Sequence, residues 1–191
     1  MRLLRRLVLA PVRTILALVF LGGLAAGPAR GQAIYSGALD GASVTPPNAS
    51  TGTGTSEVTL EGDQLLVDLS FSGLLGPTTA SHIHCCAIPP SNVGVAVNYL
   101  GFPTGVTSGT YANTFDLTSA GTYLAAFINF NGGTVGGARA ALLTGLAAGW
   151  AYTCVHTTSF GGGEIRSQFA FASFVDGFES GETDEWSAVV P

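Results

Sequence analysis

The sequence predicts a mainly β fold with one or two short helices inserted before the last two strands. Two observations predict the strands. Of the 191 residues, 27 are glycine and only 10% are charged, a composition typical of an exported β protein with many tight turns. From residue 34 onward, short segments of alternating polar and apolar residues follow one another, separated by turn residues. A third observation predicts the helices: the stretch 118–150 has apolar residues at helical spacing.

The alternating segments are the predicted strands. They cover 34–39, 55–62, 63–73, 81–86, 95–101, 108–118, 151–158 and 163–171. Segment 63–73 is the clearest, because Leu65, Val67, Leu69 and Phe71 share one face of it. The link "EGDQ" before it reads as a hairpin turn.

The helical stretch predicts one helix over 135–147, ended by Gly149, and a shorter one near 120–130. Ala138, Ala141, Leu142 and Leu146 are the residues with this helical spacing. The segment therefore interrupts the series of strands.

The N-terminus reads as a secretory signal peptide over residues 1–33. Arg2, Arg5, Arg6 and Arg13 precede an apolar run of about a dozen residues, which ends in small residues suited to cleavage. Arg13 makes the run too short for a membrane-spanning helix, so no transmembrane segment is expected in the mature chain, although an uncleaved N-terminal anchor is the alternative. We expect a secreted, periplasmic or cell-surface protein, with a β domain over 34–172.

Charge excludes several partners. All twelve acidic residues follow the signal, and only two arginines accompany them, so the mature chain carries a formal charge of −10. Such a surface repels nucleic acid and anionic membranes and attracts cations. Much of the negative charge lies in residues 173–191, an acidic tail. This tail is either simply solvated, a sorting or surface-attachment signal, or a cation-binding patch. The extracellular partner is not identified by the sequence.

Histidines and cysteines concentrate in "SHIHCC" (81–86). Alternation puts His82, His84 and Cys86 on one face of this strand, and puts Cys154 beside His156 on another. Glu164 and Arg166 likewise share a face of the strand that follows. If these strands are neighbours, His82, His84, His156 and Glu164 form a candidate site for copper or zinc.

Other interpretations of these residues stay open. The histidines can instead hydrogen-bond loop carbonyls, and Glu164 can form a structural ion pair with Arg166. Cys85 and Cys86 are neighbours that bond to each other only with strain, which favours Cys154 as the disulfide partner of one of them. The sequence contains no G-x-S-x-G and no C-x-x-C motif, so no catalytic residue is assigned.

Several motifs in order resemble the CHRD domain, named for the repeated domain of chordin and common in exported bacterial proteins. They are "SG…VTPP…TGT", "LEGDQL", "GPTTASHIH", the helix before "GWAY", and the closing "VHT…GGEIR", which together span about residues 36–170. The resemblance implies a Greek-key-like β-sandwich or barrel without an established enzymatic activity. It assigns the family's histidines to His82, His84 and His156, and its acid–base pair to Glu164 and Arg166.

The chain departs from the family pattern at its cysteines, which implies a bridge from Cys85 or Cys86 to Cys154. The expected function is therefore a non-enzymatic binding or structural module with a divalent metal site. The alternative is a mononuclear copper- or zinc-dependent redox enzyme, distantly similar to superoxide dismutase. The distances between the imidazole nitrogens test whether a site exists.

Overall fold

The computed structural model describes residues 31–175. Nearly all of the predicted signal peptide and residues 176–191 of the predicted tail lie outside the described residues. No helix within 31–175 is long and apolar enough to cross a membrane.

The predicted mainly β fold is confirmed. The strands are β1 (Gln32–Asp40), β2 (Thr53–Glu61), β3 (Gln64–Ser72), β4 (Thr78–His84), β5 (Val95–Asn98), β6 (Gly109–Asp116), β7 (Tyr152–Thr157), β8 (Ile165–Gln168) and β9 (Ala170–Val175). The helices between β6 and β7 are the 3₁₀ turn η1 (Ala120–Thr122), α1 (Ala125–Phe130) and α2 (Val135–Ala147).

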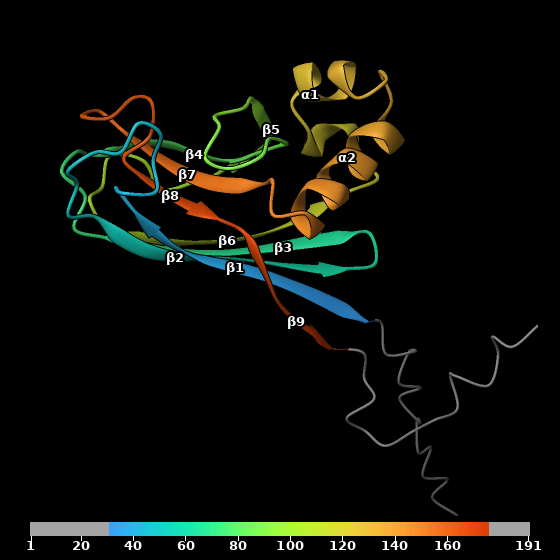
Figure 1. Cartoon of the computed structure of the whole chain (residues 1–191), viewed down its shortest axis with the longest axis horizontal. Helices are drawn as coiled ribbons and strands as arrows, with labels where there is room; N and C mark the ends of the chain where they lie inside the picture. Colours follow the sequence, from blue (N-terminus) through green and yellow to red (C-terminus); the bar gives the residue numbers. More distant parts are fainter. Residues whose placement is uncertain (1–30, 176–191) are drawn as a thin grey trace, which may run out of the picture.

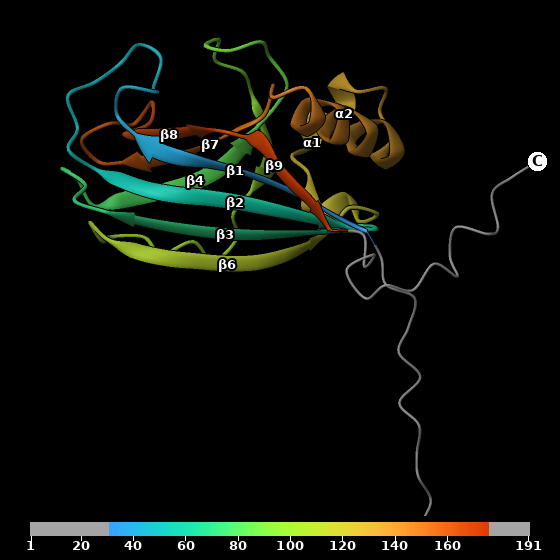
Figure 2. The same cartoon turned by 60° about the horizontal axis from the view of Figure 1, so that its bottom comes forward.

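All strands belong to one antiparallel sheet in the order β5-β4-β7-β8-β1-β2-β3-β6, with β9 also paired to β1. The sheet curls into a half-barrel at the junction of β8 and β1, where only Asp40 and Arg166 are paired. Figure 1 shows the result as two layers, with β4, β7 and β8 above β1, β2 and β3. The turned view in Figure 2 shows β1, β2, β3 and β6 side by side.

The core lies between these two layers. The predicted inward face of β3 is buried along its whole length, at Leu65, Val67, Leu69 and Phe71. Ile83 of β4 and Val155 of β7 are buried from the opposite layer and belong to the same hydrophobic cluster. Because alternate residues of a strand point to opposite faces, burying these two residues directs their neighbours to the outer face.

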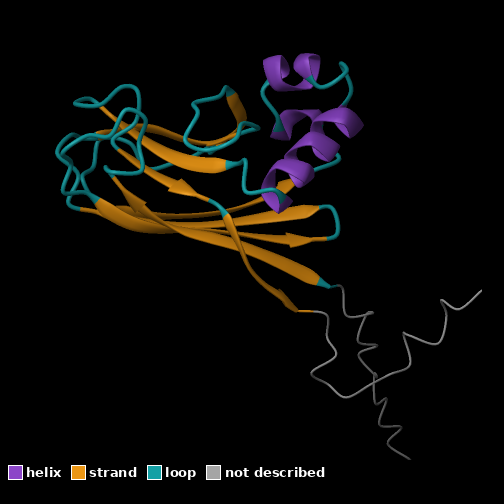
Figure 3. Cartoon of the chain, viewed as in Figure 1, coloured by secondary structure: helices purple, strands orange, loops and turns teal. Residues whose placement is uncertain are grey.

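The helices occupy one end of the sheet, as Figure 3 shows. Thr134 caps α2 by accepting a hydrogen bond from the Gly137 amide, and Gly149 follows the helix with a positive φ of 69°. The predicted bounds 135–147 are confirmed, and Ala138, Leu142 and Leu146 are buried, whereas Ala141 is only partly buried.

The end of the chain differs from the prediction. Three strands follow the helices, because the segment predicted as one strand over 163–171 divides at Phe169. The Phe169 amide donates to Ala151, after which β9 pairs with Gln32–Ser36 of β1. This strand extends three residues beyond the boundary expected at residue 172.

Candidate metal site

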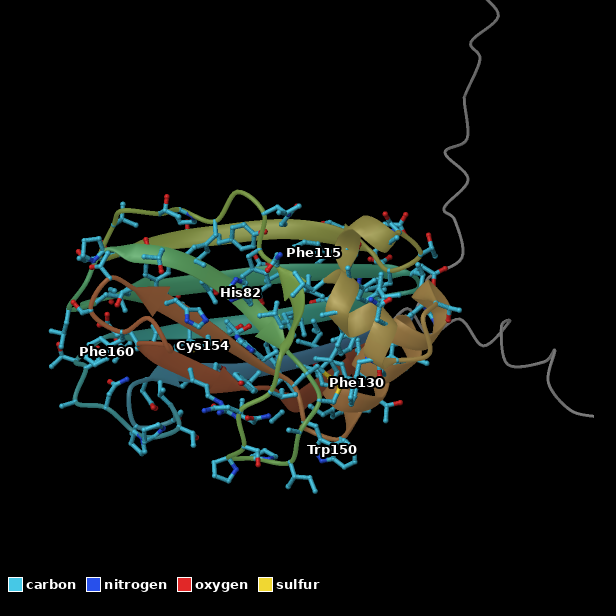
Figure 4. All side chains as sticks on the ribbon, turned by 90° about the horizontal axis from the view of Figure 1, so that it is seen from above. His82, Phe115, Phe130, Trp150, Cys154 and Phe160 are labelled. Atoms are coloured by element: carbon cyan, nitrogen blue, oxygen red, sulfur yellow. A yellow bond between two sulfur atoms is a disulfide. The ribbon has the colours of Figure 1, made fainter. Side chains whose placement is uncertain are left out.

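The outer face of β4 and β7 carries the three histidines. Ile83 and Val155 point into the core, so His82 and His84 of β4 and His156 of β7 point outward. In the ladder His82 lies opposite Cys154, and His84 lies opposite Tyr152. Figure 4 shows His82 and Cys154 on these neighbouring strands. The two strands therefore present all the histidines of the chain on one surface.

The three imidazoles lie in contact distance of one another. The ring centroid of His82 is 5.1 Å from that of His156 and 5.7 Å from that of His84, and His84 and His156 are 5.8 Å apart. One potential ligand nitrogen from each ring lies within 4.8 Å of the other two. The structure thus brings together residues about 70 positions apart in the sequence.

Hydrogen bonds orient two of the rings. His84 Nδ1 lies 2.8 Å from the Val93 carbonyl oxygen, and His156 Nδ1 lies 3.0 Å from the Gly161 oxygen. A carbonyl only accepts, so each Nδ1 carries the proton and each Nε2 keeps its lone pair. The hydrogen bonding to loop carbonyls considered for the histidines therefore exists, and it occupies one ring nitrogen of His84 and one of His156.

Three buried histidine nitrogens remain without a partner among the described residues. His82 Nδ1, His84 Nε2 and His156 Nε2 are buried and make no hydrogen bond. Buried polar atoms in native proteins nearly always have a partner. Three such atoms from three adjacent rings are the donor set of a metal site in which the protein supplies three ligands.

Burial also keeps two of the rings, those of His82 and His84, neutral. It lowers the pKa of His82 to about 4, with further lowering by the neighbouring His156 and His84. Burial likewise lowers the pKa of His84 to about 4, although its hydrogen bond to Val93 acts in the opposite direction. Metal ligation requires the neutral imidazole, so both rings are ready to bind near neutral pH.

The spacing is somewhat wider than in a closed site. Nitrogens bound to one metal at about 2.0–2.1 Å in tetrahedral geometry are about 3.3–3.4 Å apart, whereas the cluster spans up to 4.8 Å. Binding would therefore draw the most distant pair of nitrogens together by about 1.5 Å, through rotation of the histidine side chains.

The structure does not bring Glu164 into the cluster. Its carboxylate is fully buried and accepts hydrogen bonds from the Ser50 and Thr157 hydroxyls, at 2.6 and 2.7 Å, and from the Leu75 and Gly76 amides. Burial alone would raise the pKa of Glu164, but these four hydrogen bonds outweigh it and lower that pKa. Glu164 joins three chain segments and has no free lone pair directed at the histidines.

The expected ion pair between Glu164 and Arg166 is also not formed. Arg166 is 2% exposed, and it donates to the Pro90 and Ser91 carbonyls and to the Asn92 and Gln168 side chains. The salt bridge found within residues 31–175 instead joins Arg139 to Asp63 at 2.6 Å. Arg166 belongs to β8 and Glu164 directly precedes that strand, but loops from different parts of the chain supply their partners.

Tyr152 connects Arg166 to the cluster, and sequence reasoning missed it. The Arg166 guanidinium carbon lies 3.5 Å from the centre of the Tyr152 ring. His84 stacks on the same ring at 4.8 Å, with an angle of 3° between the planes. One feature of the sequence could have identified Tyr152. It precedes Cys154 by two residues, which places both side chains on the same face of β7.

The cysteines pair differently from the expectation. Cys85 is bonded to Cys86, and Cys154 is a buried free thiol. The reason is that β4 ends at His84, so the chain turns and carries both cysteines to α2, where a side chain at Gly145 would collide with their sulfurs. Burial raises the pKa of Cys154 to about 12, so this thiol stays protonated.

The disulfide lies in the wall of a separate apolar pocket of about 740 Å³ between α1, α2 and the segment 93–95. Phe130, which is 89% exposed, and Trp150 lie along this pocket (Figure 4). No charged side chain lines it. Cys85 and Cys86 thus belong to the helical end of the molecule, whereas Cys154 lies on β7 opposite His82.

Comparison with known families gives one match that covers most of the chain. The model of the CHRD domain matches residues 35–169, a range that contains all three histidines. No curated protein and no solved structure matches the chain.

Proposed function

The chain belongs to the CHRD domain family, and on that premise we propose that it is an exported, non-enzymatic module that binds copper or zinc through His82, His84 and His156. The observation that carries the proposal is the set of three buried nitrogens without hydrogen-bond partners. A transition metal would satisfy all three lone pairs at once, and imidazole is a common ligand for both ions.

Charge and sequence support the rest of the proposal. The chain beyond residue 31 has a formal charge of −10, which raises the local concentration of cations. The arginine-rich, apolar N-terminus supports export. The buried carboxylate nearest in sequence, Glu164, is engaged in four hydrogen bonds, so no free general base accompanies the histidines.

Metal titration of the mature chain tests the binding role. We expect one copper or zinc ion per chain by calorimetry and elemental analysis, and complete loss of binding in the His82→Ala/His84→Ala double variant. Thr158→Ala is a matched control, since Thr158 is exposed directly after β7. Absence of stoichiometric metal, or equal binding by the double variant, would overturn the proposal.

One observation favours a second candidate, the redox enzyme that uses the same residues. Three protein ligands leave a coordination position for a small molecule, as in catalytic metal sites. Superoxide or substrate turnover by the copper-loaded protein, lost in the double variant, would favour this enzyme. Stoichiometric copper without turnover would favour the binding module.

A further inference from the structure

We propose that the three-histidine cluster binds copper in its monovalent state, Cu(I), in preference to Zn(II), and that Arg166 determines this preference. The inference rests on the metal-binding function proposed above and names the ion for that same site. Three features of the described residues support it: the charge of the donor set, the groups that hold the donors, and a buried cation behind them.

The donor set is uncharged. The three atoms are imidazole nitrogens, and neither a carboxylate nor a thiol belongs to the cluster. The Glu164 carboxylate is held by other partners, and Cys154 does not belong to the cluster. The cost of transferring an ion from water into a protein rises steeply with its charge. A site that supplies no negative charge therefore favours a monovalent ion.

The groups behind the donors are neutral as well. His84 and His156 donate from Nδ1 to the Val93 and Gly161 carbonyls. Carboxylates in this position raise the basicity of a ligating imidazole, and here neither ring has one. The rings are consequently weaker donors than imidazoles that are hydrogen-bonded to a carboxylate.

Arg166 adds a positive charge. β7 lies between β4 and β8, so the Tyr152 ring stands between His84 and the guanidinium. The two stacking distances of 4.8 and 3.5 Å place that charge roughly 8 Å from the His84 ring. Its four hydrogen-bond acceptors are uncharged groups.

No carboxylate within residues 31–175 forms a salt bridge with Arg166. Asp40 is its partner in the ladder, but the Asp40 carboxylate accepts from the Ser43 amide. Coulomb repulsion from Arg166 therefore acts on a bound ion, and it is twice as strong for a dication as for a monocation. Among the metals that imidazole binds well, copper is the one with a stable monovalent ion.

The affinity ratio of Cu(I) to Zn(II) tests the inference. Cu(I) is titrated anaerobically with ascorbate against a chromophoric Cu(I) chelator, and Zn(II) against a zinc indicator, in a Cys154→Ala background that removes the free thiol. We expect the Cys154→Ala protein, called the parent below, to bind Cu(I) more tightly than Zn(II). In Arg166→Met the ratio should fall on the order of tenfold, as expected for one charge at this distance with an effective dielectric of about 20.

Two variants separate charge from structure. Arg166→Lys keeps the charge and should keep most of the ratio. Arg139→Met removes the other arginine of the mature chain, which is exposed and paired with Asp63, and should leave the ratio unchanged. If Arg166→Met does not fold, the protein that keeps Arg166 tests the inference by itself. Cu(I) added at a concentration equal to that of Zn(II) must then displace the bound Zn(II).

The outcomes are distinct. An unchanged ratio in a folded Arg166→Met variant, or a parent that prefers Zn(II), overturns the inference and leaves the metal-binding function intact. A parent that binds neither ion overturns that function too.

Discussion

Two polar clusters on the β4–β7–β8 side of the sheet differ in whether their buried polar atoms have hydrogen-bond partners. The Glu164 carboxylate is fully buried and accepts four hydrogen bonds, two from hydroxyls and two from amides. The histidine cluster buries three nitrogens that have no partner among the described residues, on three rings that lie beside one another.

The difference separates a structural role from a binding role. A buried charge with all its hydrogen bonds made stabilises the segments that supply them. Buried lone pairs without partners cost free energy in the metal-free protein, and an ion that binds them recovers it. Glu164 should therefore matter for stability, and the histidines for ligand binding.

The largest effect is expected at Glu164. Glu164→Gln should lower the free energy of unfolding by about 3 kcal/mol, because an amide cannot accept from all four donors and places its own donors against them. Urea denaturation of the metal-free protein measures this. Glu57→Gln, at an exposed position of β2, is the control and should change it by less than about 0.5 kcal/mol. Similar losses in both variants would contradict the structural role.

Metal should produce the next largest effect. At free metal about 100-fold above Kd, binding to the folded state alone should stabilise the protein by about 2.7 kcal/mol. Thermal unfolding with and without a chelator measures this shift. It should disappear in the His82→Ala/His84→Ala variant and persist in a folded Glu164→Gln variant. A shift that survives removal of both histidines would place the metal elsewhere.

Acid should weaken the metal-free protein through the histidines. The pKa of His82 falls from 6.5 to about 4 in the folded chain, and that of His84 does the same. Between these values the unfolded chain binds more protons, so the free energy of unfolding decreases as the pH falls from about 6.5 toward 4. We expect about 1 kcal/mol for each histidine by pH 5, after allowance for partial exposure.

Urea denaturation at several pH values in the presence of a chelator measures this slope. His82→Gln should reduce it. Glu164 does not interfere, since its lowered pKa makes its contribution fall only as the pH drops below the usual carboxyl range. Stability that is constant or rises on acidification from pH 6.5 to 5 would refute the buried, neutral state of the imidazoles.

The smallest effect is expected for an exposed polar pair. Arg139 and Asp63 form a 2.6 Å salt bridge with side chains 35% and 54% exposed. Arg139→Ala should change the free energy of unfolding by no more than about 0.5 kcal/mol, because water and salt screen such pairs. Denaturation at low and high salt measures it. If Arg139→Ala lowered the free energy of unfolding as much as Glu164→Gln, burial would not explain the difference between this exposed pair and the Glu164 cluster.

Local patterns predicted much of the fold. Alternation identified the buried face of β3, and helical spacing with Gly149 identified the bounds of α2. The same alternation placed His82 and His84 on one face and His156 on the face that Cys154 shares. Each of these features depends on residues within a few positions of one another, which is why they could be predicted from sequence.

The partners of Glu164, Arg166 and the cysteines could not be predicted in this way. Glu164 meets Ser50 and Leu75, residues about 90 to 114 positions distant, and Arg166 meets the segment 90–92. The disulfide depends on where β4 ends and on the space at Gly145 of α2. In each case a loop from another part of the chain decides the contact.

The sequence by itself determined which side chains share a face, because strand and helix periodicity is set by local backbone geometry. It therefore determined that His82 and His84 share one face of their strand and that His156 shares a face with Cys154. Only the tertiary structure decided that β7 lies beside β4, that Tyr152 and Arg166 stand behind His84, and that Glu164 is held elsewhere. Those decisions depend on long-range packing and on satisfying buried hydrogen bonds across the whole domain.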